Sequence, residues 1–348
     1  MLILLLLIIF AVLFLVFVEE YLGKYKWFAY ILIGIFLILY AGLRPVGFDR
    51  DSENYENYFM HPDSRINEIS VEPSFLILSR LLYPFFPDVH ILFFLYALLG
   101  VGLKFFAIKR ITNLLFLPIL IYVCNFFLLH DVTQIRAGVI SGLFLLSIKP
   151  LSEGKRLHAL CYIMIGAIFH FSALALLPLL FLSNTPISRK WKIAWAMVVP
   201  VCFLLYFSGF DLLTTFHIPY ISDKIDIYQR LSETKLEKES ILNPFPLIKM
   251  AVFLYLLYFS ETIKPYVPSI YLLIKILACS VLFYFAFTSI KIVSMRISEL
   301  YGIIEIVLYP CIIYTIRPIN FGKLVVCIIA FIEIYFQLIQ WEILNFSI

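Results

Sequence analysis

Apolar runs long enough to cross a bilayer follow one another along the whole chain. A helix of about 20 apolar residues spans the hydrocarbon core of a membrane. Ten such windows can be traced, at residues 1–18, 27–43, 90–108, 113–129, 133–149, 192–208, 245–260, 267–288, 297–316 and 323–345. The pattern therefore predicts an all-α polytopic membrane protein.

Two further apolar segments do not fit a simple crossing. Residues 73–87 contain three prolines and an arginine, and residues 157–182 are too long for one span and too short for two. We expect each to enter and leave on the same side, as a re-entrant or interfacial helical segment. The prediction is a single transmembrane domain, residues 1–348, with about ten transmembrane helices and two such segments.

The distribution of basic residues predicts the orientation of these spans. With this span count, one face holds 13 Lys and Arg residues in short loops, and the opposite face holds six, plus four in the long loop 209–244. Short cytoplasmic loops carry the excess of Lys and Arg. Both termini and the two longest loops, 44–70 and 209–244, are then outside. Residues 221–238 of the second loop predict an amphipathic surface helix.

Composition agrees with a membrane protein and adds little about partners. The 348 residues are 63% hydrophobic and 14% charged, and the mean hydropathy is +0.98. Many of the Lys and Arg residues behind the net charge of +4 are explained by the orientation of the spans, so this charge does not indicate a nucleic-acid partner. Glu19 and Glu20 follow the first run where a cleavage site would lie, which indicates an uncleaved span. All six cysteines lie in apolar runs without metal-ligand spacing and are expected to be buried small hydrophobic residues.

Arg136 is the most unusual charge in the chain. It lies between the apolar runs 113–129 and 137–148, two residues after Gln134 and five after Asp131. A guanidinium stays charged and is costly at bilayer depth unless it faces a polar cavity or an anion. The alternative is an ion pair that only fixes helix packing.

Arg44 and Asp49 lie where the second span ends. Two glycines and Pro45 interrupt the helix there, and acidic and aromatic residues follow. Either these side chains belong to a site, or Arg44 is a snorkelling arginine beside a solvated loop. Asp49 and Asp51 also form an Asp-x-Asp pattern, which is a weak signal for a divalent cation. No metal is expected.

His170 and Arg296 complete the candidate site. If residues 157–182 form a hairpin, His170 lies at its tip as a general base or phosphate ligand, although a lone histidine is often an ordinary core residue. Arg296 begins a span on the outer side and could instead pair with Glu299 on the same helix face. Three arginines and one histidine are thus predicted at one depth, where arginines can neutralise a pyrophosphate without a metal.

These motifs resemble those of the EpsG/Wzy-type polymerases of bacterial O-antigen, capsular and exopolysaccharide synthesis. The resemblance covers about residues 30–315. It rests on Gly42, Arg44, Gly47, Asp49 and Tyr55; on Glu72-Pro73 with Phe75; on Gln134 and Arg136; on Phe169, His170 and Ser172; and on Arg296, Tyr301 and Pro310. Ala137 follows Arg136 where the family often has glutamine, and residues 214–244 match no family motif, which leaves acceptor recognition open.

The resemblance implies a multi-pass, glycosyltransferase-C-like enzyme of the bacterial inner membrane that needs no metal and no cofactor. Such enzymes transfer the growing glycan from undecaprenyl pyrophosphate to a sugar hydroxyl of the next lipid-linked unit at the periplasmic face, and a chain-length regulator is an expected protein partner. Alternatives are an O-antigen ligase, a membrane acyltransferase, or a flippase for lipid-linked oligosaccharide. A flippase generally has two pseudo-symmetric halves, and no repeat is visible here.

Each candidate residue receives a predicted role. The guanidinium groups bind the pyrophosphates and stabilise the departing charge, either His170 or Asp49 deprotonates the acceptor hydroxyl, and tyrosines stack on sugars. The residues are Arg44, Arg136 and Arg296 for pyrophosphate binding; His170, Asp49 and Arg136 for catalysis; and Tyr55, Tyr58 and Tyr228 for sugar binding.

Overall fold

The computed structural model describes residues 1–64, 72–208, 244–287, 291–340 and 343–344. Regular structure in these ranges is helical, apart from an isolated antiparallel bridge between Asp49 and Leu344. The described chain therefore confirms the all-α prediction. The candidate Tyr228 and the predicted helix 221–238 lie outside these ranges.

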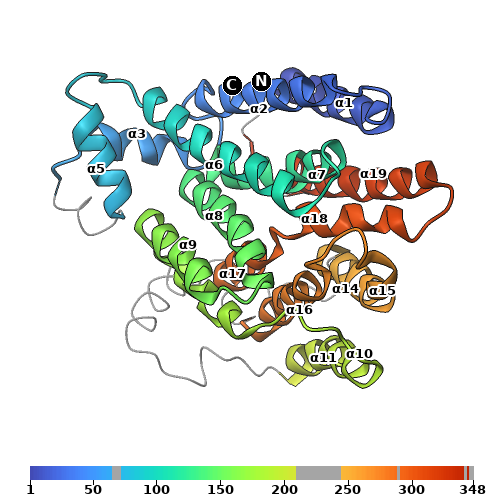
Figure 1. The fold of residues 1–348 in the computed structure, drawn as a ribbon. Helices are drawn as coiled ribbons and strands as arrows, with labels where there is room; N and C mark the ends of the chain where they lie inside the picture. Colours follow the sequence, from blue (N-terminus) through green and yellow to red (C-terminus); the bar gives the residue numbers. More distant parts are fainter. Residues whose placement is uncertain (65–71, 209–243, 288–290, 341–342, 345–348) are drawn as a thin grey trace.

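The helices follow the order of the predicted spans (Figure 1). The first part of the chain forms α1 (Leu2–Val18), α2 (Tyr25–Gly42), α3 (Ser52–Met60), α5 (Pro73–Leu82), α6 (His90–Ile111), α7 (Phe116–Ile121), the π-helix η1 (Tyr122–Thr133), α8 (Ile135–Ser152), α9 (Arg156–Phe169) and the 3-10 helix η2 (Phe171–Phe181). The second part forms α10 (Arg189–Ala196), α11 (Val198–Ser208), α14 (Pro244–Tyr258), α15 (Ser260–Ile263), α16 (Ile270–Ala286), α17 (Lys291–Gly302), α18 (Glu305–Leu308), η3 (Tyr309–Tyr314), α19 (Ile319–Tyr335) and η4 (Phe336–Gln340).

Six helices among the described residues are long and apolar enough to cross a membrane, and a seventh is added if one bent pair counts as a single span. The six are Tyr25–Gly42, His90–Ile111, Phe116–Thr133, Ile135–Ser152, Arg189–Ser208 and Ile319–Ile339, and the bent pair is Val293–Gly302 with Glu305–Tyr314. Shorter apolar helices occupy the other three predicted windows, at α1, α14 and α16. The chain is a polytopic membrane protein, as its hydropathy predicts.

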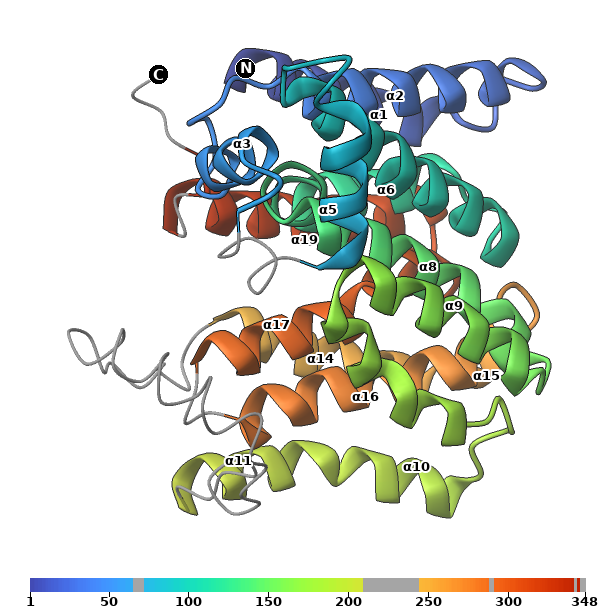
Figure 2. The same cartoon turned by 90° about the vertical axis from the view of Figure 1, so that its left-hand side faces the viewer.

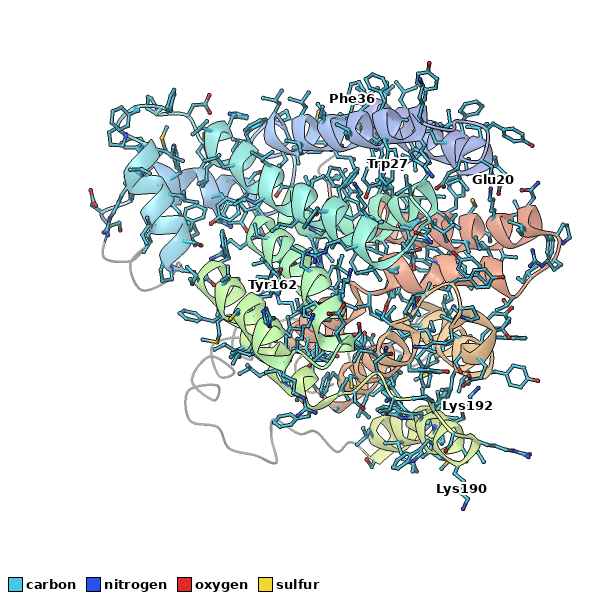
Figure 3. The ribbon with its side chains drawn as sticks, in the orientation of Figure 1. Glu20, Trp27, Phe36, Tyr162, Lys190 and Lys192 are labelled. Atoms are coloured by element: carbon cyan, nitrogen blue, oxygen red, sulfur yellow. The ribbon has the colours of Figure 1, made fainter. Side chains whose placement is uncertain are left out.

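Most long helices run roughly parallel, so the molecule has two opposite ends (Figure 2). The N-terminus, α3 and the end of α11 lie at one end, and α15 and the start of α10 lie at the other. Figure 3 shows Lys190 and Lys192, two of the predicted cytoplasmic basic residues, projecting from α10 at that second end. Helix α3 and the end of α11 at Ser208 thus lie at the end opposite to these lysines.

The two ambiguous segments differ from each other. Helix α5 lies across the direction of the spans, as an interfacial helix does (Figure 2). Helix α9 ends at Phe169, His170 is extended with φ −162° and ψ 132°, and η2 returns along α9. A Cβ atom on Gly166 would lie 3.2 Å from the Cβ of Ala173, which shows how closely the two arms approach. Residues 157–182 therefore form the predicted hairpin, with His170 at its tip.

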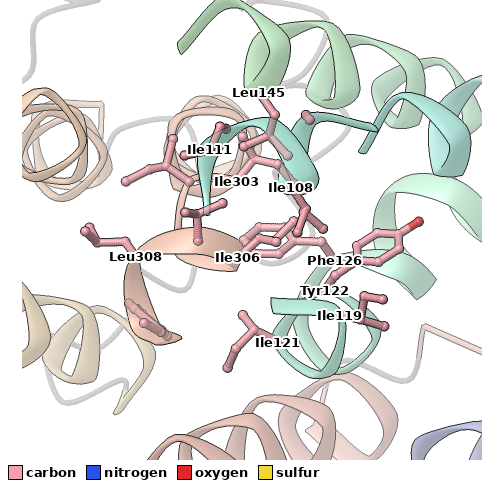
Figure 4. Packing of buried hydrophobic residues seen from close by; sticks show 14 of the residues in the cluster. Ile108, Ile111, Ile119, Ile121, Tyr122, Phe126, Leu145, Ile303, Ile306 and Leu308 are labelled. Carbon is pink, nitrogen blue, oxygen red and sulfur yellow. The ribbon is translucent and has the colours of Figure 1, made fainter. Parts of the chain in front are cut away.

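The helix formed by α7 and η1 lies at the centre of the packing. Its apolar window, Phe116–Thr133, is 94% buried, whereas the window of α10 and α11 is only 6% buried. Figure 4 shows Tyr122 and Phe126 of this central helix packed among isoleucines and leucines of α6, α8 and residues 303–308. The rim of the molecule carries exposed apolar side chains instead, such as Phe36 (Figure 3). That distribution is expected where lipid replaces water around the spans.

One detail of the predicted core is wrong. All six cysteines are free, but Cys161 is exposed on α9 and Cys279 is only partly buried. Cys161 is exposed because the hairpin presents this side of α9 to the periphery, next to the exposed Met164 and Ile165. In a membrane, burial in lipid and burial in protein give the same sequence pattern.

Candidate functional site

Arg136 lies at the break between two helices of a nearly continuous span. The π-helix η1 ends at Thr133, Gln134 adopts φ −94° and ψ 65°, and α8 begins at Ile135. Arg136 therefore belongs to the first turn of α8, where the helix dipole adds positive potential. Its side chain is 18% exposed and forms an ion pair with Glu72. The guanidinium also lies 5.6 Å from the ring centroid of Tyr55.

Glu72 connects Arg136 to His170. It is the N-cap residue of α5 and precedes Pro73, a residue suited to the first helical position. One carboxylate oxygen accepts a hydrogen bond from Arg136 Nη1, and the other lies 3.3 Å from His170 Nε2. Its side chain is only 10% exposed. An interfacial helix, a full span and a hairpin tip thus each supply one member of a three-residue contact.

The hydrogen bonds of His170 assign its two ring nitrogens. Nδ1 accepts a hydrogen bond from the backbone N–H of Ser172 at 3.0 Å. Nε2 is then the nitrogen that carries the proton in the neutral ring, and this proton points to Glu72. Both nitrogens of the imidazole are engaged, so in this arrangement neither is available to take a proton from an acceptor hydroxyl.

Arg44 and Asp49 form a buried ion pair beside this contact. Arg44 Nε lies 2.7 Å from Asp49 Oδ2, and both side chains are fully buried. Arg44 also donates to the Ala41 carbonyl at 2.6 Å and lies 3.9 Å from the ring centroid of Phe93. The second oxygen of Asp49 accepts the backbone N–H groups of residues 51 and 52. Arg44 is thus not a snorkelling side chain, and the pair closes the loop between α2 and α3.

Asp51 lies among all three predicted arginines. It is partly buried at the start of α3, and its carboxylate interacts electrostatically with Arg296, Arg136 and Arg44. Burial raises the pKa of this carboxyl and the neighbouring Asp49 raises it further, while the arginines oppose the shift. Arg296 itself is exposed on α17. The structure therefore brings the three arginines and His170 into one region, around the carboxylates of Glu72 and Asp51.

The predicted sugar-binding tyrosines have unequal positions. Tyr55 is 4% exposed, and its ring packs at 5.7 Å against that of Phe75. Burial raises its pKa to about 12, so the hydroxyl stays neutral. Tyr58 is only partly buried and remains available for a ligand. Tyr55 instead packs its ring against the Arg136 guanidinium. Sugar stacking by Tyr58 stays a prediction.

Asp131 pairs with a lysine in the neighbouring span, not with Arg136. Lys104 Nζ lies 2.9 and 2.8 Å from the two Asp131 oxygens and 2.7 Å from the Gly138 carbonyl. Tyr122 donates to the same carboxylate at 2.7 Å. Both charged side chains are fully buried. This pair ties α6, η1 and α8 together a few residues from Arg136, and its partner Lys104 was not expected from sequence.

Fold and site together define a multi-pass membrane protein with a site of arginines, carboxylates and a histidine at one end of its helices. The EpsG family model matches residues 27–346, and the chain belongs to the EpsG family. This membership supports a role as a polysaccharide polymerase and implies a glycosyltransferase-like enzyme. Searches of curated proteins and of solved structures each found no match. The resemblance inferred from the motifs is thereby confirmed, and likeness to the glycosyltransferase-C fold stays a prediction.

Proposed function

We propose that this chain polymerises lipid-linked oligosaccharide repeat units at the periplasmic face of a bacterial inner membrane. It would transfer the growing glycan from undecaprenyl pyrophosphate to a sugar hydroxyl of the next lipid-linked unit. Family membership supports the polymerase role. The observation that carries the mechanism is the contact of Arg136, Glu72 and His170, in which Arg136 Nε is buried without a hydrogen-bond partner.

In this proposal Arg136 holds the donor pyrophosphate. Its Nη1 already contacts a carboxylate, its Nε has no partner, and a guanidinium binds phosphate oxygens with paired, parallel hydrogen bonds. During transfer the bond from the anomeric carbon to the phosphate oxygen breaks, and the electron pair stays on the pyrophosphate. Arg136 and the exposed Arg296 stabilise this charge. Arg44 does not contact the pyrophosphate in this proposal but holds the loop between α2 and α3 in place through its ion pair with Asp49.

Glu72 is the proton acceptor that the geometry favours. Both nitrogens of His170 are engaged, and the Asp49 carboxylate is fully buried against Arg44 and two amides. The Glu72 carboxylate has further lone pairs on both oxygens. The acceptor hydroxyl oxygen would attack the anomeric carbon while its proton passes to Glu72. His170 then acts by positioning Glu72.

Donor binding would also prepare Glu72 for this step. A pyrophosphate placed on Arg136 competes with Glu72 for the guanidinium. The carboxylate then loses part of a neighbouring positive charge, and that loss makes it a better proton acceptor. The site would thus acquire its base only after the lipid-linked donor has arrived.

The test uses a strain in which the gene for this protein is deleted and then restored as variants. Wild type should restore long glycan ladders, whereas Arg136→Ala should leave a single repeat unit at unchanged protein level. Arg136→Lys should restore only short ladders, because lysine keeps the charge and loses the paired hydrogen bonds. Arg110→Ala, an exposed residue at the far end of α6, is the matched control and should behave as wild type. Full-length polymer from Arg136→Ala would overturn the assignment.

A further inference from the structure

A second polar cluster lies in the packed interior between α14, α18 and α19. Its charged members are Lys249, Glu305 and Glu333, and Gln337 lies one turn after Glu333 on the same helix face. Their exposed fractions are 5%, 0%, 2% and 0%, respectively. Ionisable side chains buried among spans are costly and usually serve a function.

The members of this cluster are unequally satisfied. Glu305 is the best satisfied, because its Oε1 lies 2.8 Å from Lys249 Nζ in an ion pair and its Oε2 accepts a hydrogen bond from Asn125 Nδ2 at 3.0 Å, although Oε1 has no hydrogen-bond partner. Glu333 lies close enough to interact electrostatically with Glu305 and Lys249, yet its Oε2 has no hydrogen-bond partner. The Gln337 amide donates to the Asn125 carbonyl, and its Oε1 also has no partner. The three atoms without a hydrogen-bond partner, on Glu305, Glu333 and Gln337, are therefore all acceptors.

The charges of the cluster do not balance. Two buried carboxylates face one lysine, which leaves one negative charge without a partner in an apolar interior. Such an uncompensated charge is strongly unfavourable unless a positive charge joins it. Tyr309 and Cys124 are the other titratable groups near Glu333 from neighbouring elements, and neither supplies a positive charge.

A broken helix ends at this cluster. Helix α17 stops at Gly302 and α18 starts at Glu305, with a bend of 40° between the two halves of this span. A Cβ atom on Gly302 would lie 2.9 Å from both Glu305 Oε1 and Lys249 Nζ. The carbonyl end of α17 thus abuts the ion pair and adds negative potential. Discontinuous helices in membranes often place such ends at bound cations or protons.

We propose that the cluster binds one monovalent positive charge, a proton or an alkali-metal ion, at the oxygens of Glu333 and Gln337. A divalent ion is not favoured, because a single positive charge already balances the two carboxylates and Lys249, and the unpartnered donors of Glu333 and Gln337 are one carboxylate oxygen and one amide oxygen. A hydrogen-bonded chain connects this binding site to α17. Lys249 donates to Ser280 at 3.2 Å, and Ser280 donates to the Ser298 carbonyl at 2.6 Å, two residues from Arg296.

The test measures the unfolding temperature of the full-length protein in detergent between pH 5.5 and 8.5, with sodium, potassium or choline chloride. A bound proton predicts a fall of about 2 °C per pH unit in choline, since the folded state holds a proton that the unfolded chain releases. An alkali ion predicts instead a rise of about 2 °C per tenfold increase in sodium or potassium at high pH.

Two variants restore the charge balance in different ways. Glu333→Gln removes the second carboxylate, and Glu305→Gln leaves Lys249 to pair with Glu333. Each should abolish both dependences, so a folding defect in one still leaves the other as a test. Glu153→Gln, in an exposed pair with Lys155, is the control and should keep the wild-type dependence. Wild-type protein that responds to neither pH nor alkali ions, or variants that respond as wild type does, would overturn the proposal.

Discussion

Replacing Glu72 by glutamine tests the centre of the proposed mechanism. The substitution keeps the shape of the side chain and removes its charge. Glu72 accepts one charge-assisted hydrogen bond from Arg136 and contacts His170 at 3.3 Å, with 10% of its side chain exposed. A hydrogen bond to a charged group contributes about 1.5–3 kcal/mol. If Glu72 only held its neighbours in place, the rate would fall by about 10- to 100-fold.

The expected loss is larger, because general base catalysis contributes about 10²- to 10⁴-fold. Glu72→Gln should therefore reduce kcat by at least about 10²-fold and should not raise KM for the lipid-linked donor, since pyrophosphate no longer competes with a carboxylate for Arg136. The assay is the rate of ladder growth by purified protein in liposomes with lipid-linked repeat units.

Asp63→Asn is a matched control for this experiment. It makes the same change of carboxylate to amide in an exposed pair, where Asp63 lies 3.0 Å from Arg80. Its side chain is 85% exposed, and no effect on the rate is expected. A Glu72→Gln enzyme whose kcat stays within about 100-fold of the control would refute Glu72 as the base.

Other predictions concern the residues around the site. Asp131→Asn leaves Lys104 buried without a counter-charge and should cost about 3–5 kcal/mol, whereas the double variant with Lys104→Met should recover much of this in detergent unfolding. Asp51→Asn should bind inorganic pyrophosphate more tightly in calorimetry, because it removes a negative charge beside three arginines. The raised pKa of Asp51 has a defined sign: the folded protein holds this proton more tightly, so this group adds stability as the pH falls through its folded pKa towards the lower unfolded pKa, and this stability is lost as the pH rises through the folded pKa. Pyrophosphate affinity should rise over the same window in wild type and not in the variant.

Part of this architecture was predictable because membrane constraints are simple. The length of the apolar runs predicted the spans. The hairpin at His170 was expected because residues 157–182 are too long for one span and too short for two, and because a reversal there keeps the basic loops on one face. Arg136 was evident because a charge interrupted two apolar runs. Lys104 escaped notice, since one lysine hardly lowers the hydropathy of a 22-residue helix, and its pairing with Asp131 is purely tertiary. The π-helical form of η1 also has no local signal in the sequence.

The partner of Arg136 was harder to predict. Glu72 is 64 residues away in sequence and belongs to a short interfacial helix. The dipeptide Glu72-Pro73 was recognised only as part of a family pattern, and no local rule connects it to a distant arginine. Likewise, sequence placed Arg44 and Asp49 near the site without indicating that they neutralise each other in a buried pair.

The three members of the central contact are anchored in different ways. Arg136 belongs to a helix that crosses the whole membrane, Glu72 begins a helix that lies along its surface, and His170 caps a hairpin that enters from the opposite side. The depth of α5 follows the lipid surface, whereas the depth of α8 follows its own apolar length. The ion pair of Arg136 with Glu72 therefore joins two helices that respond differently to bilayer thickness, and we expect a thinner or thicker membrane to strain this contact without changing any residue.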